Sequence, residues 1–263
     1  MNVYIITDLE GVAGVVSWNQ TEGESPAYEE AKKLLTGEVN AAIEGLLECG
    51  VKDIIVGDWH GIGGLTYTDL HPSAKLMHGR PWGTYAARDA ATAHCDVFII
   101  IGQHAMAGTI DGNLNHTQCS VTIEYYKLNG QPVGEIAQFA LYQGSLNRPL
   151  IYLSGDEAAC REAEALVPGI VTTAVKKGLG RQCALCLSPA ESRRKIREDV
   201  KKAIANHRAK PIAPVTLPAP WTLEKKFTAS QYADSECNDP NFQRIDSTTV
   251  RIQLKDIKEA LWR

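Results

Sequence analysis

Short apolar runs alternate with longer amphipathic stretches through the first half of the chain. Each run is bounded by Gly, Asp or Pro, and its continuous hydrophobicity is typical of a strand buried on both faces, as in a parallel sheet. The stretches between the runs have the composition of helices. A strand followed by a helix, repeated, predicts an α/β layered domain. The four predicted strands are VYIIT (3–7), DIIVG (53–57), DVFIIIG (96–102) and PLIYLSG (149–155).

Capping residues indicate where the predicted helices begin and end. The first helix starts after Ser25, a favourable N-cap, with Pro26 in its first turn, and it stops at Gly50. Two further helices are expected at 84–95 and 134–143.

The pattern changes after about residue 167. A strand is expected at 170–179, and the clearest helix of the chain, at 188–207, begins with a capping box. A proline-rich connector, two strands at 222–230 and 247–256, and a short helix follow. The sequence therefore predicts an α/β fold with a mostly parallel sheet layered with helices over residues 1–167, and a smaller α+β C-terminal domain over residues 168–263.

Composition and charge exclude some kinds of protein. The chain has 263 residues, of which 44% are apolar and 22% charged, enough to bury a sizeable core. Its net charge of −4 offers no broad basic field for nucleic acid, and no apolar run approaches the ~20 residues that span a membrane. The N-terminus does not resemble a signal peptide. Seven scattered cysteines favour a reducing compartment, the cytoplasm, and the lone CxxC of Cys183 and Cys186 is more typical of structure than of a zinc knuckle.

Metal-type side chains follow three of the predicted strands. Asp8 and Glu10 follow the first strand, His60 follows the second, and His104 follows the third. In an open parallel sheet, ligands bind beyond the carboxyl ends of the strands, and residues two apart in extended chain point to one side. We therefore expect these four side chains to meet at one edge of the sheet.

A cation is the simplest explanation for such a cluster. Each signal alone is weak, because acid pairs arise by chance and a strand-end histidine is more often a hydrogen-bonded structural residue. Together they are stronger, because unpaired carboxylates at a buried edge either cost several kcal/mol or take up protons, and a divalent cation removes that penalty. Mixed histidine and carboxylate ligation suits zinc, with manganese or iron as alternatives.

Three further residues have two interpretations each. Glu135, at a helix start, is a fifth ligand or a glutamate that stabilises the helix dipole. His116 is a free acid/base group or an ordinary loop histidine. Asp58 orients a ligand histidine or is a turn residue at a strand end. Spacing alone leaves these alternatives open.

The order and spacing of these motifs resemble those of the zinc-dependent D-aminopeptidase family over nearly the whole chain. TDLEGVAG is similar to the family's opening D-x-E-G motif, GDWHG to its strand-end histidine segment, GQHAMAGT and NHT to its next two histidines, and PVGE to its later glutamate. YEEAKKLLTGEVNAAI, LHPSAKLMHGRP, CLSPAES and STTVRIQ extend the likeness. Trp59 departs from the family, because a small polar residue is usual there.

The resemblance implies a two-zinc aminopeptidase that acts on short peptides, with N-terminal D-residues expected. It places His116 at the position of the family's proposed catalytic histidine and implies a homo-oligomer, a ring of ten subunits. The alternatives are another binuclear metallohydrolase, such as an amidase or esterase, and a non-enzymatic metal-binding protein. The ligands that the resemblance implies are Asp8, Glu10, His60, His104 and Glu135.

Overall fold

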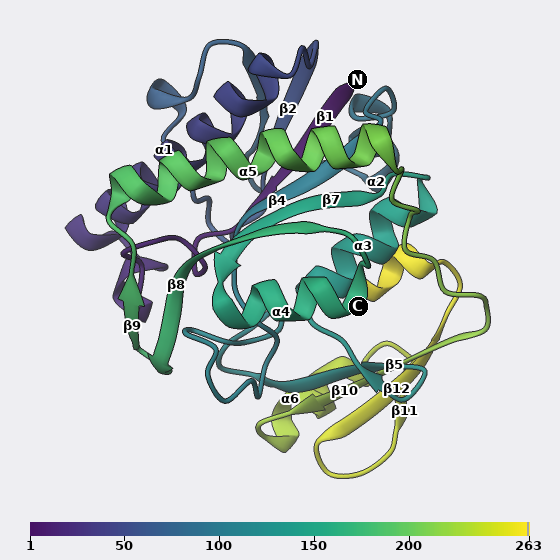
Figure 1. Ribbon diagram of the computed structural model, residues 1–263. Coiled ribbons are helices and arrows are strands. Elements are labelled where there is room, and N and C mark those ends of the chain that lie inside the picture. The colour runs from purple at the N-terminus through teal and green to yellow at the C-terminus, as the bar shows by residue number, and fades with distance from the viewer. Residues whose placement is uncertain (262) are drawn as a thin grey trace.

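A seven-stranded sheet organises the larger part of the molecule (Figure 1). The computed structural model describes residues 1–261 and 263. The strands run in the order β3-β2-β1-β4-β7-β8-β9, and all neighbouring pairs are parallel except β8 and β9. They are β1 (Asn2–Thr7), β2 (Asp53–Asp58), β3 (Ala74–Met77), β4 (Val97–Gln103), β7 (Leu150–Asp156), β8 (Val171–Gly180) and β9 (Cys183–Cys186).

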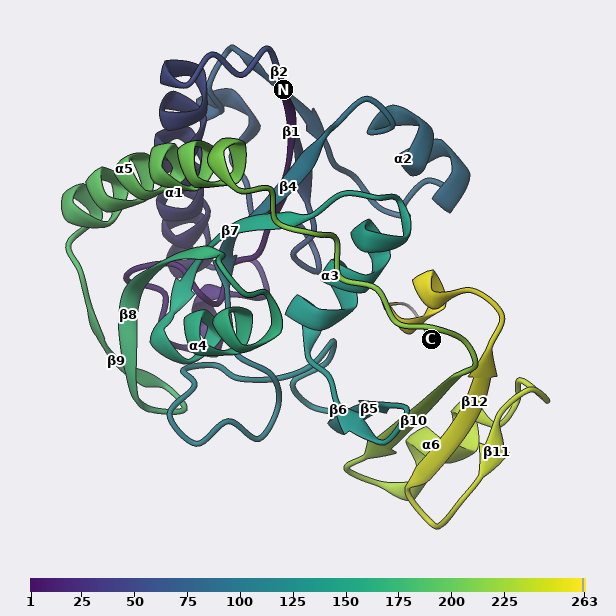
Figure 2. The ribbon, with the colours of Figure 1, turned by 45° about the vertical axis from the view of Figure 1, so that its right-hand side comes forward.

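Helices cover both faces of this sheet. Because successive strand residues point to opposite faces, β1 contributes Val3 and Ile5 to one core and Tyr4 and Ile6 to the other. Helices α1 and α5 pack on the first core, and α3 and α4 pack on the second (Figure 2). None of the helices in the described residues is long and apolar enough to cross a bilayer. The helices are α1 (Pro26–Glu48), α2 (Tyr85–Ala91), α3 (Glu135–Ser145), α4 (Glu157–Leu166) and α5 (Pro189–Ala209).

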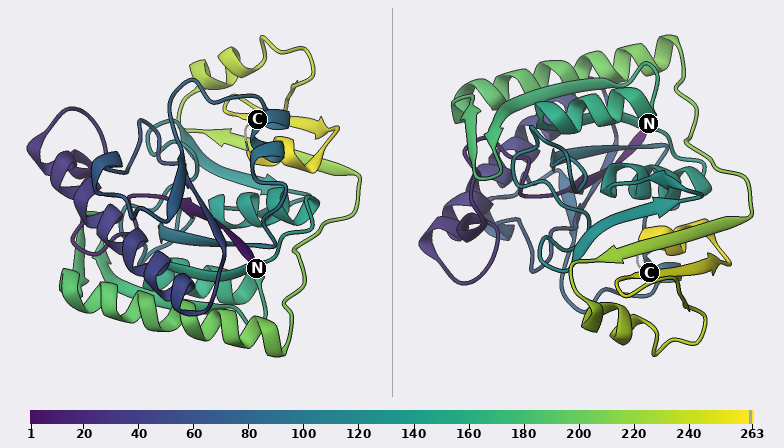
Figure 3. Two further views of the ribbon diagram at one scale, coloured as in Figure 1. Left: turned by 90° about the horizontal axis from the view of Figure 1, so that it is seen from above. Right: turned by 90° about the horizontal axis from the view of Figure 1, so that it is seen from below.

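A second, antiparallel sheet lies on the far side of α3 (Figures 2 and 3). Its strand order is β11-β12-β10-β5-β6, and Leu141 of α3 belongs to its core. Apolar packing therefore joins this sheet to the larger layer. Its elements are β5 (Ile123–Leu128), β6 (Gln131–Pro132), β10 (Trp221–Phe227), α6 (Ser230–Glu236), β11 (Gln243–Arg244), β12 (Thr249–Leu254) and the 3-10 helix η3 (Ile257–Leu261).

The predicted fold class, a mostly parallel α/β sheet with a smaller α+β part, is confirmed. The two sheets do not divide at residue 167, however. β8, β9 and α5 follow that residue but belong to the larger layer, because Val175 of β8 and Ile196 of α5 are buried in the same core as β1. β5 and β6 precede it but belong to the second sheet. The division into two domains stays a prediction.

Two predicted elements need correction, and one helix was not predicted. The helix expected at 84–95 ends at Ala91, and the Thr92 hydroxyl then bonds the Arg88 carbonyl as the chain turns towards β4. The last-but-one predicted strand ends at Phe227, because α6 follows closely. Helix α4 was missed, although Asp156 is an N-cap whose side chain accepts a hydrogen bond from the Ala159 amide.

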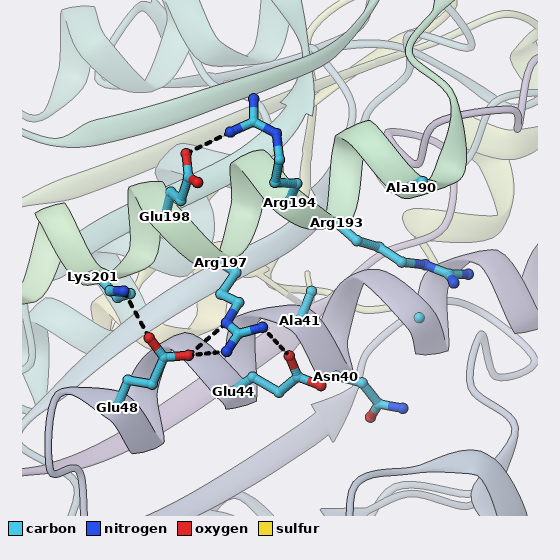
Figure 4. A pocket seen from close by; sticks show the side chains of 11 residues that line it. Asn40, Ala41, Glu44, Glu48, Ala190, Arg193, Arg194, Arg197, Glu198 and Lys201 are labelled. Carbon is cyan, nitrogen blue, oxygen red and sulfur yellow. Dashed lines mark hydrogen bonds and ion pairs between the residues drawn. The ribbon is translucent and has the colours of Figure 1, made fainter.

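Helices α1 and α5 approach closely where glycines of α1 face α5. Figure 4 shows the hollow between them, in which Arg197 and Lys201 of α5 pair with Glu48 of α1. A Cβ added at Gly45 would lie 2.6 Å from the carbonyl oxygen of Arg197, a backbone atom. A Cβ added at Gly37 would instead meet the far end of a flexible arginine side chain. A side chain at position 37 is therefore expected to be tolerated, whereas one at position 45 forces the two helices apart.

We expect Gly45→Ala to lower the free energy of unfolding by roughly 1–3 kcal/mol, because the two helices must separate. Gly37→Ala is the matched control, since it gains the same ~1 kcal/mol of helix propensity on the same helix but displaces only a side chain. It should leave stability unchanged or slightly raised. Urea unfolding of both variants measures the difference, and equal stability would contradict this account of the crossing.

Glu38 is a buried carboxylate that ties α1 to two other segments. Its Oε1 accepts hydrogen bonds from the Ala13 amide at 3.1 Å and from the Ser192 hydroxyl at 2.9 Å. Burial is the main cause that raises the pKa of Glu38 to about 7, from an ordinary 4.5. The folded protein therefore holds this proton to a higher pH than the unfolded chain does.

Stability should consequently fall as the pH rises through the window between those two pKa values. The contribution of the protonated carboxyl is complete below pH 4.5 and is lost through pH 7. We expect Glu38→Gln to remove roughly 1–3 kcal/mol of this pH dependence between pH ~5 and ~8. Glu30→Gln, on the exposed face of the same helix, is the control. Identical pH profiles of urea unfolding for wild type and Glu38→Gln would rule the explanation out.

Candidate metal centre

The carboxyl ends of β1, β2 and β4 are level at one edge of the main sheet. Thr7 of β1 pairs with Asp58 of β2 on one side and with Ile101 of β4 on the other. The chain leaves the three strands at neighbouring points, as parallel pairing requires. The four side chains expected to meet here follow these ends: Asp8, Glu10, His60 and His104.

These four side chains converge, and Glu135, the first residue of α3, joins them. His60 Nε2 lies 3.3 Å from Glu10 Oε1. His104 Nε2 lies 3.2 Å from Asp8 Oδ2 and 3.5 Å from Glu135 Oε1. Ligand-type atoms of Asp8, Glu10 and His104 all lie within 4.8 Å of one another, and all three residues are buried. Segments distant in sequence therefore form one cluster of three carboxylates and two imidazoles.

Gly102 permits the close approach of β4 to the end of β1. Its φ is +82°, a conformation that side chains other than glycine rarely adopt. A Cβ at this position would lie 2.1 Å from the carbonyl oxygen of Asp8. The glycine before Gln103 and His104 is thus part of how the cluster is assembled.

His116 lies against His104 in the same cluster. The two ring centroids are 3.8 Å apart with an interplanar angle of 17°, and His116 Nε2 lies 3.9 Å from Glu135 Oε1. Ligand atoms of His104, His116 and Glu135 form a second group within 4.8 Å. The ring of Trp18 packs edge-on against His116, with centroids 5.5 Å apart. His116 is therefore placed either to bind a metal or to transfer a proton beside one.

Hydrogen bonds determine the tautomers of two of the histidines. His104 Nδ1 lies 2.9 Å from the Ala105 carbonyl oxygen, and His116 Nδ1 lies 2.9 Å from the Leu114 carbonyl oxygen. Because a carbonyl oxygen only accepts, each Nδ1 carries a proton, and Nε2 is the nitrogen of each ring that a metal would bind. A ring N–H bonded to a backbone carbonyl is typical of histidines that bind metals.

Unpaired buried atoms indicate that the cluster suits a cation. Within the described residues, Glu10 Oε2, His60 Nδ1 and His104 Nε2 are buried and have no hydrogen-bond partner. Buried polar atoms without partners cost free energy, and clustered carboxylates repel one another. A divalent cation offsets both costs, and carboxylate oxygens with imidazole nitrogens are ligands that zinc prefers. The residues present therefore fit the zinc that the resemblance implies.

Burial and mutual charge perturb the pKa values of the cluster. Burial, reinforced by the charge of Glu10, raises the pKa of Asp8 to about 7. Burial also disfavours ionised Glu10 and Glu135, but the positive charges of His60 and His104 respectively outweigh it and lower both pKa values. The pKa of His60 is raised to about 9, because the charge of Glu10 outweighs the effect of burial. The carboxylates therefore need positive charge beside them to stay ionised in this buried site. Protonated histidines or a metal ion can supply that charge.

Two glutamines hold carboxylates of the cluster in place, and the sequence analysis did not identify them. Gln103 Nε2 donates a hydrogen bond to Asp8 Oδ2 at 3.0 Å. The backbone amide of Gln118 donates to Glu135 Oε1 at 2.7 Å. The Leu9 amide also donates to Asp8 Oδ1 at 2.9 Å. Both carboxylates are therefore held in orientation by the protein and can use their remaining lone pairs on a ligand.

Lys176 supports the loop that carries Glu10. Its ammonium group, buried beneath the loop, donates to the carbonyl oxygens of Glu10 and Val15 and to Asn113 Oδ1, the last at 2.8 Å. The pairing register of β7 and β8 shifts just before Lys176. Simple alternation along the strand therefore gave no signal that this lysine is buried.

Asp58 is a turn residue rather than a partner of a ligand histidine. Its Oδ1 accepts a hydrogen bond from the Gly64 amide at 2.8 Å, and its Oδ2 lies 3.4 Å from the Leu65 amide nitrogen. These bonds close the loop that follows β2. Of the two interpretations that the sequence left open, the structure supports the turn.

A cavity of about 500 Å³ opens above the cluster. Its volume is within the range of sites for small ligands. Part of its wall is aromatic, and apolar and acidic side chains line it as well. The lining residues outside the cluster include Trp18, Glu22, Trp59, Ile62, Trp82 and Val121.

Comparison with known proteins decides the family. A model of the D-aminopeptidase family matches residues 1–262. The chain belongs to the D-aminopeptidase family. The resemblance seen in the motifs is thereby confirmed, and with it the predicted class of enzyme, an aminopeptidase.

Two relatives support this membership in the D-aminopeptidase family. A D-aminopeptidase of Bacillus subtilis (strain 168) is 30% identical over an alignment 268 residues long. The alignment covers 99% of this chain and 94% of the relative. A solved structure, described as the Zn-dependent D-aminopeptidase DppA from Bacillus subtilis, a self-compartmentalizing protease, matches with a TM-score of 0.90 and 28% identity. That match covers 99% of this chain and 94% of the other.

Proposed function

We propose that this member of the D-aminopeptidase family is a zinc-dependent aminopeptidase that removes the first residue of short peptides, preferentially a D-residue. The observation that carries the proposal is the buried cluster of carboxylates and imidazoles beneath a cavity of about 500 Å³. The solved relative is described as Zn-dependent, and the donor atoms found here suit the same metal.

We assign two zinc ions to each subunit. Ligand atoms of Asp8 lie within 4.8 Å of those of both Glu10 and His104, so Asp8 would hold metal together with either of them. His60 lies beside Glu10 on one side, and Glu135 lies beside His104 on the other. The proposed ligands are therefore Asp8, Glu10, His60, His104 and Glu135.

The metal and the chain have separate tasks in this proposal. Two zinc ions, when bound, supply polarisation of the peptide carbonyl and a water of lowered pKa. Glu22, a cavity-lining carboxylate that is not among the proposed ligands, would attract the positively charged amino terminus of a peptide. The tryptophans of the wall shield the reacting bond from bulk water, which strengthens electrostatic interactions inside the site.

His116 moves the proton at its Nε2 atom. Burial and the positive charge of His104 lower the pKa of His116, so its ring is neutral and Nε2 can accept a proton. The bond from Nδ1 to the Leu114 carbonyl holds the ring in orientation. Nε2 would accept a proton from the attacking water and then deliver it to the departing amine.

We further propose that the subunits form a homo-oligomer in the cytoplasm, and the resemblance implies a ring of ten. The solved relative is described as self-compartmentalizing. All seven cysteines of this chain are free thiols, which suits a reducing compartment. Light scattering measures the subunit number, and a monomer at all concentrations would argue against the assembly.

A panel of three peptides tests the activity of the zinc-loaded protein. We expect D-Ala-D-Ala to be hydrolysed faster than L-Ala-L-Ala, and N-acetyl-D-Ala-D-Ala to resist hydrolysis because it lacks a free amino terminus. Failure to hydrolyse either free peptide, with bound zinc confirmed by elemental analysis, would count decisively against the aminopeptidase assignment. Hydrolysis of the acetylated peptide at the same rate would indicate a different amidase.

A further inference from the structure

Arg80 lines the cavity, but its guanidinium group bonds to the protein backbone. Nε donates to the Gly61 carbonyl oxygen at 2.7 Å, and Nη2 donates to the carbonyl oxygens of His60 at 2.7 Å and Asp58 at 3.2 Å. Nη1 donates to the Gly79 carbonyl oxygen at 3.1 Å. Three of the four acceptors thus belong to the segment that carries His60.

A stack of aromatic rings supports the guanidinium group. The Arg80 Cζ atom lies 4.0 Å from the centre of a Trp82 ring, and Trp82 stacks on Trp59 with centroids 4.6 Å apart. Trp59 packs edge-on against Phe139 of α3, and its Nε1 donates to the Tyr4 hydroxyl at 2.6 Å. The stack therefore runs from the hydrophobic core to Arg80, and such contacts restrict the orientation of an arginine.

His60 lacks the hydrogen bond that orients the other two histidines of the cluster. His104 and His116 each donate Nδ1–H to a backbone carbonyl, whereas His60 Nδ1 has no partner in the described residues. Its Nε2 faces Glu10. Besides Glu10 and the Tyr28 ring, whose centroid lies 6.3 Å from that of His60, the backbone on either side of His60 directs its ring, and this is the backbone that Arg80 binds.

We propose that Arg80 is a positioning residue for His60, and that the Trp82–Trp59 stack positions Arg80. The bonds from the guanidinium fork to the carbonyl oxygens of Asp58, His60 and Gly61 substitute for a ring hydrogen bond. Lysine cannot replace it, because an ammonium group is a point charge without a planar fork. The inference rests on the proposed metal site, since positioning His60 matters only if His60 is a ligand.

Zinc affinity of Arg80→Ala and Arg80→Lys, measured by competition with a chromogenic chelator, tests the inference. Loss of a partner that orients a metal ligand typically weakens binding by roughly 10–100-fold, and we expect both variants to lose that much affinity for the ion that His60 would bind. The visible spectrum of each cobalt-substituted variant should also differ from that of the cobalt-substituted wild type. Arg181→Ala is the control, because Arg181 lies 5.8 Å from the Trp18 ring and bonds the Ser120 carbonyl instead.

The melting temperature of the metal-free proteins separates positioning from folding. We expect metal-free Arg80→Ala to melt within a few degrees of wild type, and Trp82→Leu, which keeps Arg80, to show a smaller loss of zinc affinity. Wild-type zinc affinity in a folded Arg80→Ala, or in Arg80→Lys, would overturn this inference and leave the proposed function standing. A wild-type protein that bound no zinc would overturn the proposed function and this inference together.

Discussion

Substitution of His104 by alanine is expected to abolish most activity of the zinc-loaded protein and to lower its zinc content sharply from the proposed two ions per subunit. His104 Nε2 lies between Asp8 and Glu135, at 3.2 and 3.5 Å. Its loss removes a proposed ligand of the site and leaves the carboxylates of Asp8 and Glu135 without the imidazole that contacts both of them. The loss in kcat/KM should exceed the roughly 10–100-fold that follows removal of an outer partner of a metal ligand.

His94→Ala is the matched control for that substitution. His94 is an exposed histidine whose Nε2 lies 2.7 Å from Asp53 at the start of β2, the end of the strand opposite the cluster. Elemental analysis and peptide hydrolysis should give wild-type values for it. If His104→Ala kept both zinc ions and full activity, the assignment of His104 as a ligand would be wrong.

Substitution of His116 by alanine is expected to separate catalysis from metal binding. General acid–base groups contribute roughly 10²–10⁴-fold to rate, so kcat should fall by that amount. Zinc content and KM should change little, because His116 is proposed to transfer protons rather than to bind the metal. Steady-state kinetics with D-Ala-D-Ala, paired with elemental analysis, measure both quantities.

The same experiment distinguishes the two roles that the geometry allows His116. Its ligand atoms group with those of His104 and Glu135 within 4.8 Å, so it could bind a metal itself. A zinc content that drops as far as in His104→Ala would show that His116 is a ligand. Unchanged kcat would remove it from the mechanism altogether.

The sequence predicted the three strands that end at the cluster, and their convergence, because both follow from short-range patterns and from sheet geometry. It did not predict the edge strands β3 and β9. Continuous apolar runs such as 3–7 and 96–102 have few alternatives to a strand buried on both faces. Once those strands are parallel neighbours, their carboxyl ends must be level, and Asp8 and His104 come together. That step needed no knowledge of long-range packing.

Features that depend on long-range pairing were not predictable in the same way. The boundary expected at residue 167 followed a change in composition, but composition does not determine that β8 pairs with β7 and joins the main sheet. Alternation along β8 predicts that Lys176 is exposed. It is buried instead, because the pairing register shifts just before it. The bonds of Arg80 to the His60 segment join residues about twenty positions apart, with the strand β3 between them, and no hydrophobic period indicates them.

The most direct test of the metal centre is X-ray diffraction at the zinc absorption edge from crystals grown with zinc. The account predicts two anomalous difference peaks beyond the carboxyl ends of β1, β2 and β4, within bonding distance of the proposed ligands Asp8, Glu10, His60, His104 and Glu135. A well-ordered structure of the zinc-soaked protein with no anomalous peak at this edge of the sheet would contradict it.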